Sequence, residues 1–267
     1  MQNNKQLLSI IIPFYNEQEV IEECQSRLSN AVKVIDMNVE MIYINDGSKD
    51  NTLPILAELM ETDARIKIID LSRNFGKEIA MTAGIDAAQG DAVIVIDADL
   101  QDPPELMVDM VTAWREGYDV VYAKRVERKG ESFMKKLTAR LFYKLINKIS
   151  DTEIPENVGD FRLMSRQAVD ALNEVRERKR FMKGLFAWIG FPQKAIEYSR
   201  DPRFAGETSW NYGKLIKFAV EGISSFTQEP LRLATYAGFI TALAAFGLGL
   251  YFVIKTLLFG EVIQGFP

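Results

Sequence analysis

One stretch of the sequence decides the fold: Val93-Ile94-Val95-Ile96-Asp97-Ala98-Asp99-Leu100-Gln101-Asp102-Pro103-Pro104. Its first four residues are apolar and β-branched, which predicts a buried strand. Two carboxylates one residue apart follow, then an amide and a third carboxylate, and the Pro-Pro pair ends the strand. A buried strand that presents acidic side chains at its C-terminal end is typical of an open α/β sheet with a ligand site at that edge.

The spacing of the polar residues in this stretch favours a metal site. Alternate side chains of a strand point to the same side, so Asp97, Asp99 and Gln101 would face one target if the extended geometry persists. Three oxygen-bearing groups suit a hard divalent cation such as Mg²⁺ or Mn²⁺. The alternative is an acidic turn after a strand, because the D-x-D pattern is common. The stretch alone does not decide between the two.

Strands and helices alternate around this stretch with short loops between them. Apolar runs predict strands at residues 7–13, 39–44, 66–71, 91–96 and 119–123. Helical spacing predicts helices at residues 17–36, 52–62 and 104–116, and another that follows Lys77 and ends at Ala88. This alternation predicts an α/β fold with a mostly parallel sheet and flanking helices.

Polar loops follow the first four predicted strands. They are Phe14–Glu17, Asn45–Ser48, Ser72–Lys77 and the Asp97 stretch itself. The C-terminal ends of parallel strands share one edge of the sheet, so these loops are expected to build one site. Neither G-x-G-x-x-G after the first strand nor G-x-x-x-x-G-K-[ST] occurs, which disfavours dinucleotide oxidoreductases and P-loop NTPases.

Composition excludes several classes of site. The chain has 267 residues, is 48% apolar and carries a net charge of −5, so bulk charge does not indicate nucleic acid as a partner. It contains no histidine, which removes histidine triads, histidine metal ligands and the usual general base. The single cysteine, Cys24, excludes a disulfide framework and a zinc cluster, and its helical setting predicts an inert buried thiol. Any metal must therefore be held by oxygen atoms.

Two segments indicate a membrane. Basic residues strongly outnumber acidic ones between Lys124 and Lys148, and apolar residues recur there at helical spacing. This predicts a basic amphipathic helix at about 132–149 that lies at a membrane surface or binds phosphates. A solvated cationic helix over a protein core is the alternative for this segment. Leu233 to Ile254 contains no charged residue and meets the requirement of about 20 residues for crossing a bilayer. Lysine and arginine before this helix place the large domain in the cytoplasm by the positive-inside rule.

The motifs together resemble a known family. They are Pro13-Phe14-Tyr15-Asn16-Glu17, Asn45-Asp46-Gly47-Ser48, Ser72-Arg73-Asn74-Phe75-Gly76-Lys77, Asp97 to Pro104, and Arg203-Phe204-Ala205-Gly206-Glu207-Thr208-Ser209. In this order they resemble family 2 glycosyltransferases of the GT-A fold, in the polyprenyl-phosphate branch that includes dolichol-phosphate mannose synthases and bactoprenol glucosyltransferases. Gly159-Asp160-Phe161-Arg162 and the apolar tail are most similar to the bactoprenol enzymes. The resemblance covers nearly the whole chain.

This resemblance implies roles for individual residues. The donor nucleotide sugar would be bound by Pro13, Tyr15, Asn16, Glu17, Asp46, Gly47, Ser48, Arg73, Lys77, Asp97 and Asp99. Asp99 and Gln101 would ligate Mg²⁺ or Mn²⁺ together with the diphosphate, and Arg203 would close over the diphosphate with its loop. The acceptor phosphate would contact Arg125, a cation of the basic helix (Lys136 or Arg140) and Arg162. Asp99, Asp160 and Arg203 are the expected catalytic residues.

The implied reaction is the inverting transfer of a hexose, with glucose from UDP-glucose expected first, to undecaprenyl phosphate at the cytoplasmic membrane. A phosphate monoester has its second pKa near ~6 and is largely a dianion at neutral pH, so it needs no deprotonation. We therefore expect Asp160 to position the acceptor or the sugar rather than to take a proton. The alternatives are another sugar (mannose, N-acetylglucosamine or aminoarabinose), a saccharide acceptor, and a membrane-anchored binding module without activity.

The expected domain organisation follows the same resemblance. Residues 1–210 would form the catalytic domain, 211–229 an interfacial helix, 231–259 a transmembrane helix and 260–267 the start of an extracytoplasmic loop. Members of this branch usually carry two transmembrane helices, so a second helix is expected to be missing here. Gly238 with Ala242, and Ala245 with Gly249, give small-residue spacing that permits close helix packing and predicts a homo-oligomer.

Overall fold

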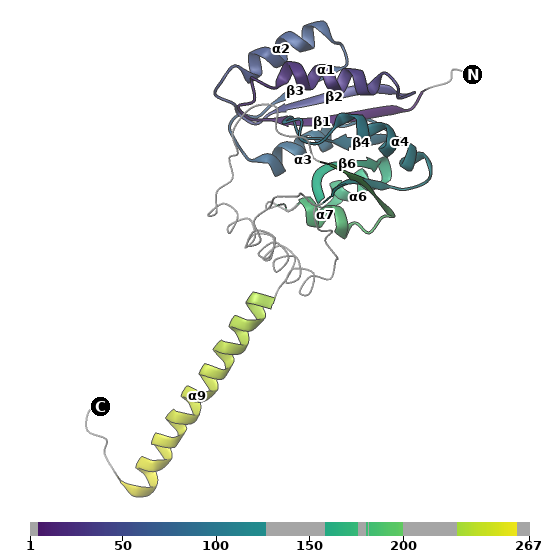
Figure 1. Cartoon of the computed structure of the whole chain (residues 1–267). Coiled ribbons are helices and arrows are strands. Elements are labelled where there is room, and N and C mark those ends of the chain that lie inside the picture. Colours follow the sequence, from purple (N-terminus) through teal and green to yellow (C-terminus); the bar gives the residue numbers. More distant parts are fainter. Residues whose placement is uncertain (1–4, 127–157, 176–179, 181, 200–228, 261–267) are drawn as a thin grey trace. The chain divides into compact units, whose positions relative to one another are not determined.

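The computed structural model describes residues 5–126, 158–175, 180, 182–199 and 229–260 (Figure 1). The chain divides into two compact units, Met1–Ser225 and Phe226–Pro267, and each is described by itself. The predicted basic helix at 132–149, the interfacial helix at 211–229 and the loop that contains Arg203 lie outside the described residues.

The first unit is built on a seven-stranded sheet with the order β3-β2-β1-β4-β6-β5-β7. Its strands are β1 (Leu7–Phe14), β2 (Asn38–Asn45), β3 (Ile66–Asp70), β4 (Ala92–Val95), β5 (Val120–Arg125), β6 (Val158–Ser165) and β7 (Gln193–Tyr198). All pairings are parallel except those of β6, which runs antiparallel to both β4 and β5. The predicted mostly parallel α/β sheet is confirmed.

Helices connect these strands and cover the sheet (Figure 1). They are α1 (Ile21–Val32), α2 (Thr52–Thr62), α3 (Lys77–Ala87), the 3₁₀ turn η1 (Pro104–Leu106), α4 (Met107–Arg115), α6 (Arg166–Glu174) and α7 (Met182–Trp188). The predicted helix at 17–36 is shorter in the structure. The backbone N–H groups of Glu17 and Gln18 donate to the side chains of Thr52 and Asp50, which holds this segment as a turn before the helix begins.

The structure places Asp160 and Arg162 in a different element from the one that the sequence suggests. The sequence around them suggests a loop that enters a short strand, but the structure places both on β6, a central strand whose eight residues are all buried. Glycine and aspartate at its start resemble loop residues. Pairing with β4 on one side and β5 on the other overrides that local preference.

The extended geometry expected after β4 does not persist. The strand ends at Val95, and Leu100 adopts a left-handed conformation with φ of 57°. This backbone turn breaks the alternation of side chains that an extended strand would give. Asp97, Asp99 and Gln101 therefore do not share one side because of strand periodicity, and the expectation based on it is wrong.

The helices pack closely on the sheet. A Cβ atom on Gly84 of α3 would lie 2.4 Å from Ile11 Cγ2 and 2.8 Å from Ile44 Cδ1, so this glycine allows α3 to approach β1 and β2. On α1, Cys24 is buried as predicted, and burial, reinforced by the charge of Asp99, raises the pKa of its thiol to about 12. A thiol with so high a pKa stays protonated and unreactive.

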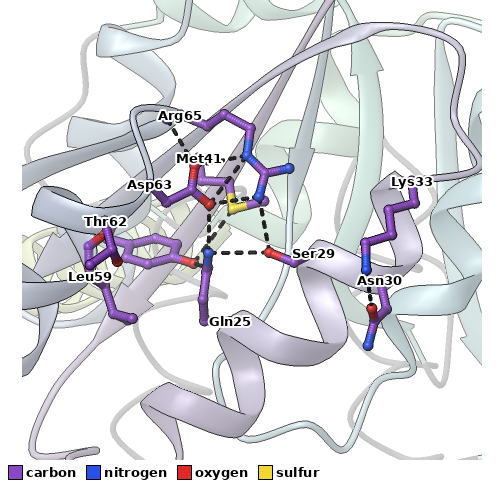
Figure 2. Close-up of polar contacts among 10 residues, drawn as sticks. Gln25, Ser29, Asn30, Lys33, Met41, Leu59, Thr62, Asp63 and Arg65 are labelled. Atoms are coloured by element: carbon purple, nitrogen blue, oxygen red, sulfur yellow. Dashed lines mark hydrogen bonds and ion pairs between the residues drawn. The ribbon is translucent and has the colours of Figure 1, made fainter.

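A polar cluster fastens α1 to the turn between α2 and β3 (Figure 2). Gln25 donates to Asp63 at 2.9 Å and to Ser29 at 3.2 Å, while Arg65 contacts the same Asp63 at 2.6 Å. The hydroxyl of Tyr43 donates to the Gln25 carbonyl oxygen. These contacts satisfy half-buried polar groups beside the core and hold α1 against the turn between α2 and β3.

The second unit contains one long helix, α9 (Glu229–Phe259). Leu231–Leu258 is long and apolar enough to cross a membrane by length and composition, and none of the most apolar part is buried within the structure. A helix that is apolar on all sides and leaves those side chains uncovered by protein is typical of a membrane span.

Candidate active site at the carboxyl edge of the sheet

The sheet topology gathers functional side chains at one edge. Asp46 follows β2, Asp97 and Asp99 follow β4, and Arg125 ends β5; these three strands run in the same direction, so their ends lie at the same edge of the sheet. Because β6 is antiparallel, its first residues, including Asp160, lie at that edge as well. The reversed strand thus places a carboxylate between the ends of β4 and β5.

Lys77 joins two carboxylates from different strands. Its ammonium lies 2.6 Å from Asp97 Oδ1 and 2.5 Å from Asp160 Oδ2. Lys77 is the first residue of α3, and the preceding Gly76 takes a φ of 97°, a conformation that favours glycine. The side chain of Lys77 is 40% exposed, whereas the two carboxylates are largely buried, so the bridge can be reached by a ligand from the side of Lys77.

Asp160 is held as a carboxylate by its neighbours. Burial alone would raise its pKa, but the charges of Lys77, Lys183 and Arg162 outweigh burial and hold the pKa of Asp160 well below its usual range. Its Oδ1 atom is buried and has no hydrogen-bond partner within the described residues. An ionised oxygen with an open lone pair is suited to accept a hydroxyl group of a ligand.

Arg162 is occupied by the protein itself. Its Nη2 donates to the carbonyl of Gly159 at 2.9 Å, its Nε lies 3.4 Å from the carbonyl of Asp160, and its guanidinium stacks on Phe186 at 3.7 Å. Its side chain is buried. These contacts support the backbone beneath Asp160, and they leave Arg162 less free for an acceptor phosphate than the sequence suggests.

Two further charged residues of this region were not assigned to the site from the sequence. Lys183 of α7 lies within the field of Asp160, Lys77, Arg125 and Arg162, and burial together with these three cations lowers its pKa. Glu78 accepts a hydrogen bond from the backbone N–H of Met182, and burial, reinforced by Asp160, raises its pKa to about 7. Lys183 lies far in sequence from the motifs at the strand ends, and Glu78 follows the Ser72–Lys77 motif without being part of it. Only the fold reveals that both lie near the site.

The residues predicted to bind a metal offer part of a coordination shell. Asp99 is buried, and its Oδ1 accepts a hydrogen bond from the backbone N–H of Gln101 at 3.1 Å, so the two side chains belong to one tight turn. Within the described ranges no group of three or more acidic, histidine or cysteine side chains is placed to hold a metal. A carboxylate and an amide oxygen fit a cation that completes its shell with substrate phosphates and water, as Mg²⁺ commonly does.

The loops predicted to bind the donor pack against one another. The Asp46 carboxylate accepts hydrogen bonds from the backbone N–H groups of Phe75 at 2.7 Å and Gly76 at 3.0 Å, and burial raises the pKa of Asp46. A Cβ on Gly47 would lie 2.3 Å from the backbone of Arg73, so the two loops touch at a glycine. Asp46 therefore shapes the site through the backbone of residues 75–76.

The outer rim of these loops is exposed. The Asn16 and Ser48 loops are joined by a hydrogen bond of 3.0 Å between the Asn16 N–H and the Ser48 hydroxyl. Tyr15 is 41% exposed, and Arg73 lies 4.3 Å above the exposed ring of Phe75. Pro13 is half-buried near the end of β1, and the Glu17 N–H donates to Thr52. An accessible aromatic ring beside a cation suits the stacking of a base and the binding of phosphate.

The remaining predicted residues fall into two groups. Arg125 lies at this edge, where its Nε donates to the Tyr198 hydroxyl at 3.0 Å and its Nη2 lies 3.6 Å from Asp102 Oδ1. Arg203, Lys136 and Arg140 lie outside the described residues. Tyr198 was not expected at the site, because a tyrosine at the end of a strand has no distinctive pattern in the sequence.

Comparison with known proteins identifies relatives over most of the chain. Residues 9–172 match the family described as glycosyl transferase family 2. An uncharacterized glycosyltransferase of Synechocystis is 50% identical over 259 residues, covering 97% of this chain and 81% of the relative. A prophage bactoprenol glucosyl transferase homologue of Escherichia coli is 44% identical over 260 residues, covering 97% and 85%. The bactoprenol glucosyl transferase of Shigella phage SfV is also 44% identical over 260 residues, covering 97% and 85%.

Solved structures share the fold. A mannosyltransferase from Pyrobaculum calidifontis in complex with GDP-Man and Mn²⁺ has a TM-score of 0.54 at 16% identity, covering 97% of this chain and 82% of that one. Glucosyl-3-phosphoglycerate synthase from Mycobacterium tuberculosis, in complex with Mn²⁺ and UDP-glucose, has a TM-score of 0.53 at 20% identity, covering 82% and 77%. These similarities confirm the GT-A arrangement predicted for the sheet and its helices.

Proposed function

The chain belongs to glycosyl transferase family 2 and is a glycosyltransferase, and from that premise we propose that it transfers a hexose from a nucleoside-diphosphate sugar to a polyprenyl phosphate. Glucose from UDP-glucose is the first donor to test, because relatives 44% identical to the chain are named bactoprenol glucosyl transferases. The long apolar helix α9 supports an acceptor held in a membrane. We propose the cytoplasmic membrane, with the sheet unit on its cytoplasmic side, as the place of action.

One observation carries the proposal: Asp160 lies between Lys77, which we assign to the donor, and the strand end of Arg125, which we assign to the acceptor. Lys77 ties it to Asp97 in the loop after β4, while Arg125 lies beside the adjoining Gly159. The cations around Asp160 also include Arg162 and Lys183. A phosphate dianion is attracted by such a group of cations, whereas an uncharged sugar hydroxyl gains less from them.

The proposed chemistry is a single displacement. An oxygen of the acceptor phosphate forms a bond to the anomeric carbon of the sugar, while the bond from that carbon to the diphosphate oxygen breaks and the nucleoside diphosphate leaves with the electron pair. A divalent cation bound by Asp99 and Gln101 would neutralise the negative charge of the leaving diphosphate. Inversion at the anomeric carbon follows from one displacement.

Asp160 has the wrong acidity for a general base at neutral pH. Its cationic neighbours keep its pKa low, and a carboxylate with a low pKa takes protons poorly. The acceptor phosphate is largely ionised above its second pKa of ~6 and needs no base. Asp160 therefore orients Lys77 and accepts a substrate hydroxyl through its free Oδ1.

The proposal is tested with the full chain in proteoliposomes that contain undecaprenyl phosphate. UDP-glucose, UDP-N-acetylglucosamine and GDP-mannose, each with a labelled sugar, are supplied in turn with Mn²⁺. A lipid-extractable labelled product is expected with one donor, and Asp99→Ala should abolish it. Donor hydrolysis without a lipid product would instead favour a saccharide acceptor, and the absence of both reactions with every donor would contradict the proposed activity.

A further inference from the structure

Asp102 is a buried carboxylate that the proposed reaction does not use. It is 1% exposed and lies one residue after Gln101. Its Oδ1 accepts a hydrogen bond from the hydroxyl of Tyr198 and lies 3.6 Å from Nη2 of Arg125. Burying a charge away from water is costly unless the charge is paired and hydrogen-bonded, so the buried Asp102 carboxylate depends on Tyr198 and Arg125.

The direction of these hydrogen bonds is fixed by chemistry. A guanidinium only donates and a carboxylate only accepts, so the Tyr198 hydroxyl must accept from Arg125 Nε and donate to Asp102. Burial, reinforced by the charge of Asp102, raises the pKa of Tyr198, so the phenol keeps its proton through the physiological range. The two hydrogen bonds therefore run in one direction, from Arg125 to Tyr198 and from Tyr198 to Asp102.

The backbone holds the three side chains in place. Arg125 and Tyr198 are the last residues of β5 and β7, and they are partners in the parallel register of these strands. On the neighbouring strand, a Cβ on Gly159 would lie 2.8 Å from Arg125 Nη2 and 3.3 Å from Asp102 Oδ2. The guanidinium thus lies against the glycine that directly precedes Asp160, where a larger residue would displace it.

We propose that Tyr198 and Asp102 are positioning residues that hold the Arg125 guanidinium against Gly159, the residue before Asp160, in the orientation that receives the acceptor phosphate. The inference rests on the proposed function, in which Arg125 contacts that phosphate. Nε is bound to Tyr198 and Nη2 lies 3.6 Å from Asp102, so the guanidinium is anchored on two sides while the side chain stays 30% exposed. A long side chain that is already ordered loses less conformational entropy when it binds a ligand.

The inference predicts a selective defect in Tyr198→Phe. This variant keeps the ring and removes the hydroxyl that links Arg125 to Asp102. The KM for undecaprenyl phosphate should rise about tenfold because Arg125 is no longer pre-ordered, while kcat and the KM for the nucleotide sugar stay within about twofold. Tyr118→Phe is the matched control, since Tyr118 precedes the opposite end of β5 and packs on Lys194; it should change none of these constants.

A double-mutant cycle tests whether Tyr198 acts through Arg125. Arg125→Lys keeps the charge but removes the Nε donor, so Tyr198→Phe should have little further effect on the lipid KM in that background. Asp102→Asn keeps the shape of the side chain and removes its charge. It should raise the KM for undecaprenyl phosphate in the wild-type chain but not in the Arg125→Lys variant. Thermal unfolding of each variant provides a check that the fold is retained.

The outcomes separate this inference from the function on which it rests. If Arg125→Lys raises the lipid KM but Tyr198→Phe does not, or if their effects simply add, Tyr198 does not position Arg125 and only the inference is overturned. If Arg125→Lys leaves the lipid KM unchanged while lipid product still forms, Arg125 does not bind the acceptor phosphate and the inference is overturned with that assignment. If Tyr198→Phe lowers kcat and raises the KM for both substrates to a similar extent, Tyr198 has only a structural role and the inference is overturned.

Discussion

At the scale of the residue, Lys77 controls the site. It contacts Asp97 from the loop after β4 and Asp160 from β6, two carboxylates that would repel each other without it. Like charges at close range raise one another's pKa, whereas an opposite charge lowers it. The ionised state of Asp160 at neutral pH therefore depends on Lys77.

Replacing Lys77 with methionine should impair the reaction more at low pH. We expect kcat to fall by ~100-fold because the two carboxylates lose their common anchor and shift relative to the substrate. The pKa of Asp160 should rise because burial is then opposed only by the remaining cations. Rates measured from pH 5.5 to 8.5 should show an acid limb at higher pH in Lys77→Met than in the wild type. Lys33→Met is the control, because Lys33 is exposed and directly follows α1, where it contacts Asn30 (Figure 2). An unchanged acid limb in Lys77→Met would contradict the role of Lys77.

Glu78 should make the protein less stable as pH rises. Its pKa is about 7 in the folded chain and near 4.5 in the unfolded one, so the unfolded chain loses this proton first. The penalty is absent below pH ~4.5, grows between ~4.5 and ~7, and stays constant above that range. Glu78→Gln should accordingly raise the free energy of unfolding at pH 8 by up to ~3 kcal/mol and have little effect near pH 4.5.

Thermal unfolding at several pH values checks this behaviour of Glu78. Glu61→Gln on the exposed surface of α2 is the matched control, and it should show no such pH-dependent gain. An equal shift of the melting temperature by Glu78→Gln at pH 5 and pH 8 would show that ionisation of Glu78 is not the cause.

At the scale of the element, the reversed strand β6 and the close packing of α3 decide the geometry. The antiparallel direction of β6 brings its first residues, Gly159 and Asp160, to the edge where β4 and β5 end. The close packing of α3 on the sheet at Gly84 fixes the position of Lys77, the first residue of that helix, relative to Asp160. Both features come from packing between elements and not from the residues of the site.

Gly84→Ala should destabilise the protein although alanine is the better helix former. In an exposed helix this change is favourable by about 1 kcal/mol. Here the added Cβ would lie 2.4 Å from Ile11 Cγ2, so overpacking should lower the free energy of unfolding by about 1–3 kcal/mol. Chemical denaturation measures the change, and Ile11→Ala should make Gly84→Ala less harmful by removing the contact. Additive effects of the two substitutions would argue against the clash.

At the scale of the whole molecule, a catalytic unit and an apolar helix share one chain. Leu231–Leu258 contains the small residues Gly238, Ala242, Ala245 and Gly249, whose spacing predicts contact between copies of the helix. This homo-oligomer stays a prediction. The sheet unit alone contains every described residue of the proposed site.

Ligand binding should stabilise the full chain in a metal-dependent manner. A ligand that binds only the folded state adds RT ln(1 + [L]/Kd), or about 2.7 kcal/mol at a hundredfold excess over Kd. UDP with Mn²⁺ should therefore raise the melting temperature more than either alone, because the cation and the diphosphate complete each other's contacts. The extra shift should disappear with a chelator and in Asp99→Ala. An equal shift by UDP in the presence and absence of the metal would contradict a shared site.

The class of fold and the edge of the sheet that carries the site can be predicted from the amino-acid sequence. Apolar runs followed by polar loops predict parallel strands, and parallel strands must end at a common edge, so Asp46 and Asp97 were assigned to one site without the structure. Arg125 was assigned to that site only through the family resemblance. The absence of histidine limited any metal to oxygen ligands. These conclusions need only local patterns and the direction of the strands.

The contacts between individual side chains of the site become visible in the folded chain alone. The direction of β6 depends on its pairing with β4 and β5, so the sequence did not reveal that Asp160 lies on Lys77. The turn at Leu100 replaced the expected strand periodicity after β4. Tyr198 and Asp102 are 96 residues apart and meet at Arg125 because strand register and a glycine leave room there. Contacts across such separations depend on packing, which no local pattern of residues encodes.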